Sequence, residues 1–279
     1  MKICRFRLKE PIERSKPSSE SEKSSSALRY GIAKEGQIFE VSDPFQSKTI
    51  RSQEIQSQET QGRSWPLDDV QLLAPSAPSK IVCVGRNYAK HAAELGNALP
   101  KEPLIFLKPP SAVIAPGEAI VLTPHSERVD YEGELAIVIR KICGHLKPSD
   151  DVQPYILGYT CLNDVTARDL QEKDVQFTRA KGFDTFCPFG PWIETDLDLS
   201  ASRVETFVNK KQRQSTAIAE MIFAVDVVIR WISQMMTLLP GDVIATGTPS
   251  GVGPLAAGDV VEVSVSGIGT LRNPVAGPR

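Results

Sequence analysis

The chain has 279 residues, of which 41% are hydrophobic and 24% charged, so it is long enough to bury a sizeable core. Its net charge of −2 provides no field that would draw it to nucleic acid or to an anionic membrane. The best candidate for a membrane span, residues 221–239, is interrupted by Asp226 and Arg230. The five cysteines form no C-x-x-C pair, and reduced thiols are their simplest interpretation. We expect a cytoplasmic globular protein.

The first 75 residues differ in texture from the rest. Residues 15–26 are rich in Ser and residues 46–63 in Gln, Ser and Glu, which predicts loops or insertions. Between them, residues 27–41 predict short strands around a turn at Lys34, Glu35 and Gly36. We therefore expect a small N-terminal domain over residues 1–75 and a catalytic domain over residues 76–279.

The pattern sharpens from Lys80 onwards, where short apolar runs alternate with turn residues. Strands are predicted at 81–84, 104–107, 131–142 and 155–162, helices at 88–95, 165–176 and 217–239, and alternating strands and turns at 242–270. Strands dominate and no regular βαβα rhythm is present. This favours an α+β protein built around a rolled or sandwiched β core.

The segment 130–139, DYEGELAIVI, carries the most informative carboxylates. Residues two apart in a strand face the same way, so Glu132 and Glu134 project side by side, with Asp130 a candidate third. Two carboxylates about 6 Å apart repel by roughly 3 kcal/mol at an effective dielectric of about 20. Protonation, a basic side chain or a metal ion could remove that cost. The alternative is a pair of glutamates at a solvated strand end.

Asp164 stands where a predicted strand gives way to a predicted helix. One interpretation is a helix N-cap; the other is a third site carboxylate. Three carboxylates without a His or Cys partner suit a hard cation such as Mg²⁺, Mn²⁺ or Ca²⁺.

Three further segments carry candidate chemistry. His91 and Glu94 are three apart and would share a helix face, which suits a general base, although a solvated helix gives such pairs often. The turn 247–253, GTPSGVG, lacks the ending of a P-loop but could bring backbone N–H groups to a substrate carboxylate, or be a tight loop. Lys181 could stabilise an oxyanion or be a surface lysine.

Taken together, these segments resemble the fumarylacetoacetate hydrolase family from about Lys80 to the C-terminus. The matching motifs, in the family's order, are GRNY with His91 and Glu94, FLKP at 106–109, DYEGEL at 130–135, NDVTARDLQ at 163–171, KGFD at 181–184 and GTPSGVG at 247–253. Each motif is modest alone, and the six in order are highly specific. The family's hydrolases proper carry an additional metal-binding Asp where this chain has Arg86, so the match is to the smaller members.

The resemblance implies a β-roll catalytic domain, paired as a homodimer, with Mg²⁺ or Mn²⁺ as cofactor. It implies the following roles: metal ligands Glu132, Glu134 and Asp164; catalytic residues His91, Glu94 and Lys181; substrate-binding residues Arg86, Gln171, Gly247 and Thr248. The segment that carries His91 is expected to be mobile and to order over the substrate.

The predicted function is metal-dependent cleavage of a C–C bond in a small 2-oxo acid. The cation would act as a Lewis acid toward the enolate that forms when the bond breaks. Acylpyruvate hydrolysis ranks first because the pair His91 and Glu94 is present. The alternatives are an oxaloacetate decarboxylase, a 2-hydroxyhepta-2,4-diene-1,7-dioate isomerase or, in another class, a catalytically silent, metal-stabilised binding module.

Overall fold

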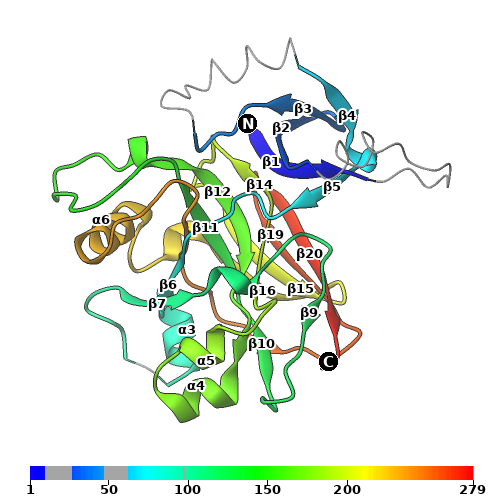
Figure 1. Cartoon of the computed structure of the whole chain (residues 1–279). Coiled ribbons are helices and arrows are strands. Elements are labelled where there is room, and N and C mark those ends of the chain that lie inside the picture. The colour runs from blue at the N-terminus through cyan, green and yellow to red at the C-terminus, as the bar shows by residue number, and fades with distance from the viewer. Residues whose placement is uncertain (10–26, 47–61, 97, 279) are drawn as a thin grey trace.

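Strands dominate the computed structural model, which describes residues 1–9, 27–46, 62–96 and 98–278 (Figure 1). The predicted α+β class, a β-rich mixed roll with a small N-terminal part, is confirmed. The predicted loops at 15–26 and, for the most part, at 46–63 lie outside the described residues. Among the described helices, none is long and apolar enough to cross a bilayer.

The largest sheet has twelve strands and runs through the whole molecule. Its main path is β4-β3-β2-β1-β14-β12-β11-β17-β6-β7, with β5 on β1 and β8 on β14. The bounds are β1 Lys2–Leu8, β2 Arg29–Lys34, β3 Gln37–Val41, β4 Ser64–Pro66, β5 Val70–Leu73, β6 Ile81–Gly85, β7 Leu104–Lys108, β8 Val113–Ile114, β11 Gly133–Ile139, β12 Ile156–Asn163, β14 Cys187–Glu194 and β17 Val243–Ala245.

Two smaller sheets complete the roll. A five-stranded sheet has the order β16-β15-β19-β20-β9, and a three-stranded sheet has the order β13-β10-β18. Their bounds are β9 Ile120–Val121, β10 Val129–Tyr131, β13 Thr166–Ala167, β15 Arg203–Val208, β16 Lys211–Ala217, β18 Gly253–Pro254, β19 Val260–Val265 and β20 Gly269–Ala276.

The N-terminal strands extend the central sheet. β2 and β3 form the predicted hairpin, whose turn places Glu35 and Gly36 at φ values of 50° and 76°. β1 pairs with β2 on one side and with β14 on the other, where Ile3 lies opposite Ile193. The N-terminal strands therefore share one hydrogen-bonded sheet with the strands that follow residue 80 (Figure 1).

Strands β11 and β12 form the buried centre of the fold. Every residue of both strands is buried. One face packs on the five-stranded sheet and on α6, and side chains of the other face, such as Ala136 and Val138, belong to two further apolar clusters. This explains why the run after Glu134 is apolar on both faces. The predicted single strand at 131–142 is wrong in one respect, since β10 ends at Tyr131 and β11 begins at Gly133. The chain leaves the three-stranded sheet and enters the large one at Glu132.

The helices are short, and their bounds are α3 Ala89–Glu94, α4 Arg168–Asp174, α5 Thr178–Lys181 and α6 Val225–Met235, with 3₁₀ turns η1 Leu67–Asp69, η2 Pro110–Ala112, η3 Gln153–Tyr155 and η4 Ile218–Glu220. The helix predicted at 217–239 is wrong over its first turns, because Met221 pairs with Tyr88 and the Phe223 N–H bonds Asn87. The helix predicted at 165–176 begins later, after β13. Helices α3, α4 and α5 gather at one end of the molecule (Figure 1).

Candidate active site

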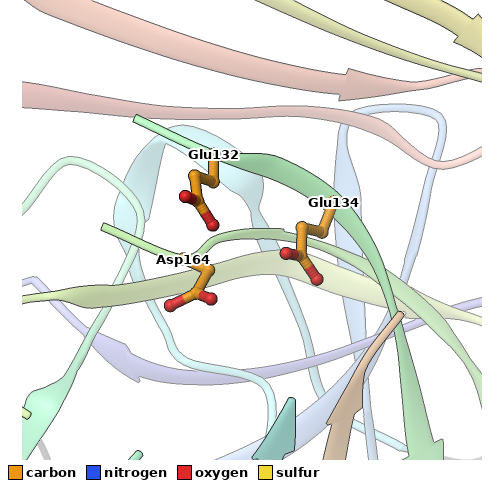
Figure 2. Close-up of side chains that lie close together, drawn as sticks. All are labelled: Glu132, Glu134 and Asp164. Atoms are coloured by element: carbon orange, nitrogen blue, oxygen red, sulfur yellow. The ribbon is translucent and has the colours of Figure 1, made fainter. Parts of the chain in front are cut away.

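Three carboxylates meet at the break between β10 and β11. Glu132, Glu134 and Asp164 each offer an oxygen, and these oxygens lie within 4.8 Å of one another (Figure 2). Their residues are only 4%, 2% and 1% exposed. The solvated strand end is therefore the wrong interpretation of the glutamate pair. The N-cap interpretation of Asp164 is wrong as well, because α4 is capped by Ala167 without a side-chain bond.

Backbone hydrogen bonds place the trio. The Glu132 N–H donates to Asn163 Oδ1 at 3.0 Å, and the Asp164 N–H donates to the Glu132 carbonyl at 2.8 Å. The end of β12 is thereby tied to the residue at which the neighbouring strand changes sheets. The carboxylates of Glu132, Glu134 and Asp164 point to the same side of the two strand ends (Figure 2).

Buried cations neutralise two of the three carboxylates. Lys181 Nζ lies 2.8 Å from Glu132 Oε2 and 2.6 Å from Asp164 Oδ2, and Lys108 Nζ lies 2.7 Å from Asp164 Oδ1. The surface-lysine interpretation of Lys181 is wrong, because the residue is 1% exposed. Burial opposes its charge, but Asp164 and Glu132 outweigh burial and raise the pKa of Lys181, so it stays an ammonium.

Arg168 supplies the third buried cation. Its guanidinium bonds Glu132 and also donates through Nε to Asp130 Oδ2 at 3.0 Å. Burial raises the pKa of Glu132, yet Lys181 and Arg168 together hold that pKa below its usual range. Asp130, a candidate neighbour of the glutamates, is thus engaged by Arg168.

Glu134 is the exception within the trio. Among the described residues it makes no ion pair, and its Oε2 accepts a 2.7 Å hydrogen bond from the Gly247 N–H. Burial, then Asp164 and Glu132, raise the pKa of Glu134 well above its usual range. Such a site lacks a positive charge beside Glu134. A site that offers only oxygen ligands and lacks one positive charge fits a hard divalent cation such as Mg²⁺ or Mn²⁺.

His91 and Glu94 form the predicted pair on α3. His91 Nδ1 lies 3.3 Å from Glu94 Oε2, and His91 is only 5% exposed, so it is not a surface histidine. Glu94 also accepts from the Gly251 N–H at 3.0 and 3.2 Å, which ties α3 to the glycine-rich turn. Arg86, with a φ of 59°, turns the chain from β6 toward α3.

One pocket of about 280 Å³ joins these groups. Its lining includes most of the predicted site residues, namely Arg86, His91, Glu132, Glu134, Asp164, Gln171, Lys181 and Thr248. Arg168 and Glu172 line it as well, and its apolar side chains include Leu95, Leu104, Phe106 and Phe177. The pocket therefore combines charged and apolar lining residues, as small-molecule sites do.

The glycine-rich turn is already bonded within the protein. The Gly247 N–H serves Glu134, and the Thr248 hydroxyl donates to the Gly133 carbonyl at 3.0 Å. Gly247 has a φ of 101°, and a Cβ there would lie 2.8 Å from Asn87 Cβ, so no other residue fits. Contact of Gly247 and Thr248 with substrate stays a prediction.

Sequence reasoning missed the roles of Lys108, Arg168 and Gln214. Both Lys108 and Arg168 stand in the family's motifs, and for Lys108 the available signal was a basic residue directly after an apolar run. Gln214 bonds Gly133, Thr248 and Pro249 from strand β16. It had no signal, because a polar residue in an alternating strand is ordinarily solvated.

Comparison with known proteins bears on both parts of the chain. Residues 80–276 match the family model described as fumarylacetoacetate (FAA) hydrolase C-terminal, and residues 1–75 match the model described as Rv2993c-like, N-terminal. Protein Rv2993c of Mycobacterium tuberculosis is 54% identical over 217 residues, which cover 77% of this chain and 82% of the relative. Oxaloacetate tautomerase YisK of Bacillus subtilis is 41% identical over 228 residues, covering 76% of this chain and 75% of the relative.

Solved structures resemble the whole chain. The 2-hydroxyhepta-2,4-diene-1,7-dioate isomerase of Mycobacterium marinum has a TM-score of 0.81 at 41% identity, covering 99% of this chain and 98% of that one. The maleylpyruvate hydrolase of Sphingobium sp. SYK-6, in complex with manganese(II) and pyruvate, has a TM-score of 0.78 at 28% identity, covering all of both chains. The chain thus belongs to the fumarylacetoacetate hydrolase family, whose members include hydrolases, isomerases and tautomerases.

Proposed function

We propose that this protein is a divalent-metal-dependent enzyme that forms and protonates the enolate of a small 2-oxo acid. The observation that carries the proposal is the meeting of the carboxylate trio, Lys181 and His91 in one pocket, with Glu94 bonded to His91 from behind the lining. Glu132, Glu134 and Asp164 would hold Mg²⁺ or Mn²⁺, and a related hydrolase is described in complex with manganese(II) and pyruvate. When bound, the cation supplies Lewis acidity toward the oxygens of a 2-oxo acid.

The chain's own residues divide the remaining work. Lys181 keeps its charge and faces the trio, so it can stabilise negative charge that develops on a substrate oxygen. His91, oriented by Glu94, can take up or deliver a proton inside the pocket. Gln171 is held by Arg168 at 2.5 Å and lines the same pocket, where it can orient the acid together with Arg86. The apolar lining residues of the pocket limit the access of water.

Keto–enol tautomerisation of a 2-oxo acid such as oxaloacetate is our first candidate reaction. It needs only that a proton leave C3 and that another reach the enolate oxygen, which one base beside a cationic site can do. Two relatives at 41% and 40% identity are oxaloacetate tautomerases. A dienedioate isomerase would use the same proton transfers on a longer acid, and the decarboxylase would use the same enolate.

Acylpyruvate hydrolysis, the reaction that ranks first from the sequence, is our second candidate. His91 would activate a water that adds to the acyl carbonyl, the C3–C4 bond would break, and the resulting enolate would be protonated at C3. The buried position of His91 beside Glu94 favours it, as does the maleylpyruvate hydrolase relative. A catalytically silent binding module is disfavoured, because such a module needs no buried histidine over a charged pocket.

We also propose that the protein acts in the cytoplasm as a homodimer, as the family resemblance suggests. Light scattering at micromolar concentration tests the assembly, and a monomer there would contradict it.

A substrate panel tests the function. The chelator-treated protein is incubated with oxaloacetate enol, acetylpyruvate and a hydroxydienedioate, each with and without added Mg²⁺ or Mn²⁺. We expect metal-dependent turnover of at least one compound, with the tautomerisation rate highest. Metal binding without turnover of any 2-oxo acid would instead support the silent module.

A further inference from the structure

Gly133 lies between the two glutamates of the trio, and side chains from elsewhere engage both of its backbone polar groups. Its N–H donates to Gln214 Oε1 at 3.0 Å, and its carbonyl accepts from the Thr248 hydroxyl at 3.0 Å. Gln214 Nε2 in turn donates to Thr248 Oγ1 at 2.8 Å and to the Pro249 carbonyl at 2.8 Å. Gly133, Gln214 and Thr248 thus form a closed ring of three hydrogen bonds, which we call the Gly133 ring.

The direction of every bond in the Gly133 ring is determined by its fixed members. A backbone N–H can only donate, so the oxygen of the Gln214 amide must face Gly133. A backbone carbonyl can only accept, so the amide nitrogen must face Pro249. The Thr248 hydroxyl then receives one hydrogen from Gln214 and gives its own to Gly133. No donor of the Gln214 and Thr248 side chains is left over for a ligand.

The position of the Gly133 ring in the fold explains why it is needed. The chain changes from the three-stranded sheet to the large sheet at Glu132, and β17 pairs with β11 only from Ala136 onwards. At Gly133, β11 is therefore paired with a strand on one side, where Asn163 of β12 lies opposite. Gln214 reaches across from the five-stranded sheet and takes the place of the second neighbour. It is 1% exposed, so its bonds are not shared with bulk water.

We infer that Gln214 is a positioning residue for the proposed metal centre. Directly and through Thr248, it fixes the two peptide groups that join Gly133 to Glu132 and to Glu134, and thereby sets the separation of their carboxylates. Through Thr248 and Pro249 it also locks the turn whose Gly247 N–H holds Glu134. Gly133 must be glycine in this arrangement, because a Cβ there would lie 2.0 Å from Thr206 Oγ1. The inference rests on the proposed function, in which these glutamates bind the cation.

Mn²⁺ affinity, measured by electron paramagnetic resonance on the full chain, tests the Gly133 ring without a substrate. Gln214→Met keeps the length of the side chain and removes every bond of the amide. Thr248→Val removes the hydroxyl, and Thr248→Ser retains it. Thr216→Val is the matched control, since Thr216 is 7% exposed and lies two residues along β16 from Gln214. The melting temperature of each variant is recorded alongside.

We expect Gln214→Met and Thr248→Val each to weaken Mn²⁺ binding by at least about tenfold, the usual size of an outer-shell effect. Thr248→Ser and Thr216→Val should bind as wild type does. The Mn²⁺ affinity of the double variant Gln214→Met/Thr248→Val should be no lower than that of the single variant with the lower affinity, because either change already opens the ring.

Three results would overturn the inference. The first is a folded Gln214→Met protein with wild-type Mn²⁺ affinity. If its melting temperature falls while its affinity is unchanged, the role of Gln214 is purely structural. The second is a double variant whose fold-loss of Mn²⁺ affinity is the product of the losses in the two single variants. The third, decisive if Gln214→Met does not fold, is equal Mn²⁺ affinity in Thr248→Val and Thr248→Ser. A wild-type protein that binds no Mn²⁺ would instead overturn the proposed metal centre, on which the inference depends.

Discussion

The carboxylate trio and His91 line one pocket, but the trio and the pair His91 and Glu94 are built differently. Glu134 lies in β11, Glu132 directly precedes β11 and Asp164 directly follows β12, and every residue of both strands is buried. The pair belongs to α3, a helix of six residues that is followed by Leu95, 39% exposed. A helix this short is not stable alone, and the contacts of Tyr88 with Met221 and of Glu94 with Gly251 hold it in place.

This difference separates cation binding from proton transfer. The trio is held by strand pairing and by buried cations, whereas α3 depends on a few single contacts with other segments. Loss of a side chain on α3 should therefore leave the cation site intact, and loss of a carboxylate should disable both functions. The predictions below test that separation from both sides.

The largest effect is expected for Glu134→Gln. The amide keeps a hydrogen-bond acceptor for the Gly247 N–H but removes the charge of a ligand. Metal affinity should fall by more than about 100-fold, beyond the range of outer-shell changes. Titration with Mn²⁺ measures this. Unchanged affinity after loss of any two carboxylates of the trio would show that the site is misplaced.

His91→Ala should come next. Removal of a general base slows a reaction by about a hundredfold or more, so the tautomerisation rate should fall by that factor at saturating metal. Mn²⁺ affinity should not change, since the ligands lie on other elements. Lys90→Ala is the matched control on α3, because the Lys90 side chain is exposed. An equal loss in Lys90→Ala would mean that α3 acts only as a cover. In acylpyruvate hydrolysis the same base activates water, so the rate of His91→Ala should fall there too. The rate of decarboxylation should fall less.

The pH dependence of metal binding sharpens the contrast within the trio. Because the pKa of Glu134 is raised, its carboxyl in the metal-free protein keeps its proton at pH values well above those at which a glutamate usually loses it. A cation needs the carboxylate, so one proton leaves on binding, and affinity should rise as pH rises, by about tenfold per unit while Glu134 remains protonated. Calorimetry in two buffers of different ionisation enthalpy measures the released proton. Affinity that is flat with pH would contradict the assignment.

Glu94→Gln should have the smallest effect. The amide oxygen can still accept from Gly251, and only the charge beside His91 is lost. We expect the rate to fall by roughly fivefold, equivalent to the loss of about 1 kcal/mol of hydrogen bonding. Steady-state kinetics at saturating metal measure it. A loss as large as that of His91→Ala would mean that Glu94 itself transfers the proton.

The sequence predicted the groups that depend on local spacing. Glu132 and Glu134 lie two apart where the chain passes from β10 into β11, and His91 and Glu94 lie three apart on a helix, so local chain geometry brings each pair together. Lys108 meets Asp164 across 56 positions, and Gln214 meets Gly133 across 81, contacts that only the closed roll creates. The helix predicted at 217–239 failed for a similar reason, since Asn87 binds the main chain at Phe223 and delays the helix to Val225.

The most direct test of the account is the ketonisation rate of oxaloacetate enol in chelator-treated protein before and after addition of Mn²⁺. The rate is followed by ultraviolet absorbance for wild type and Glu134→Gln. We predict that chelation abolishes the activity of wild type, that Mn²⁺ or Mg²⁺ restores it, and that Glu134→Gln does not recover at the same metal concentration. Full activity in the chelated protein, or equal recovery in the variant, would contradict the claim that the carboxylate trio holds a catalytic cation.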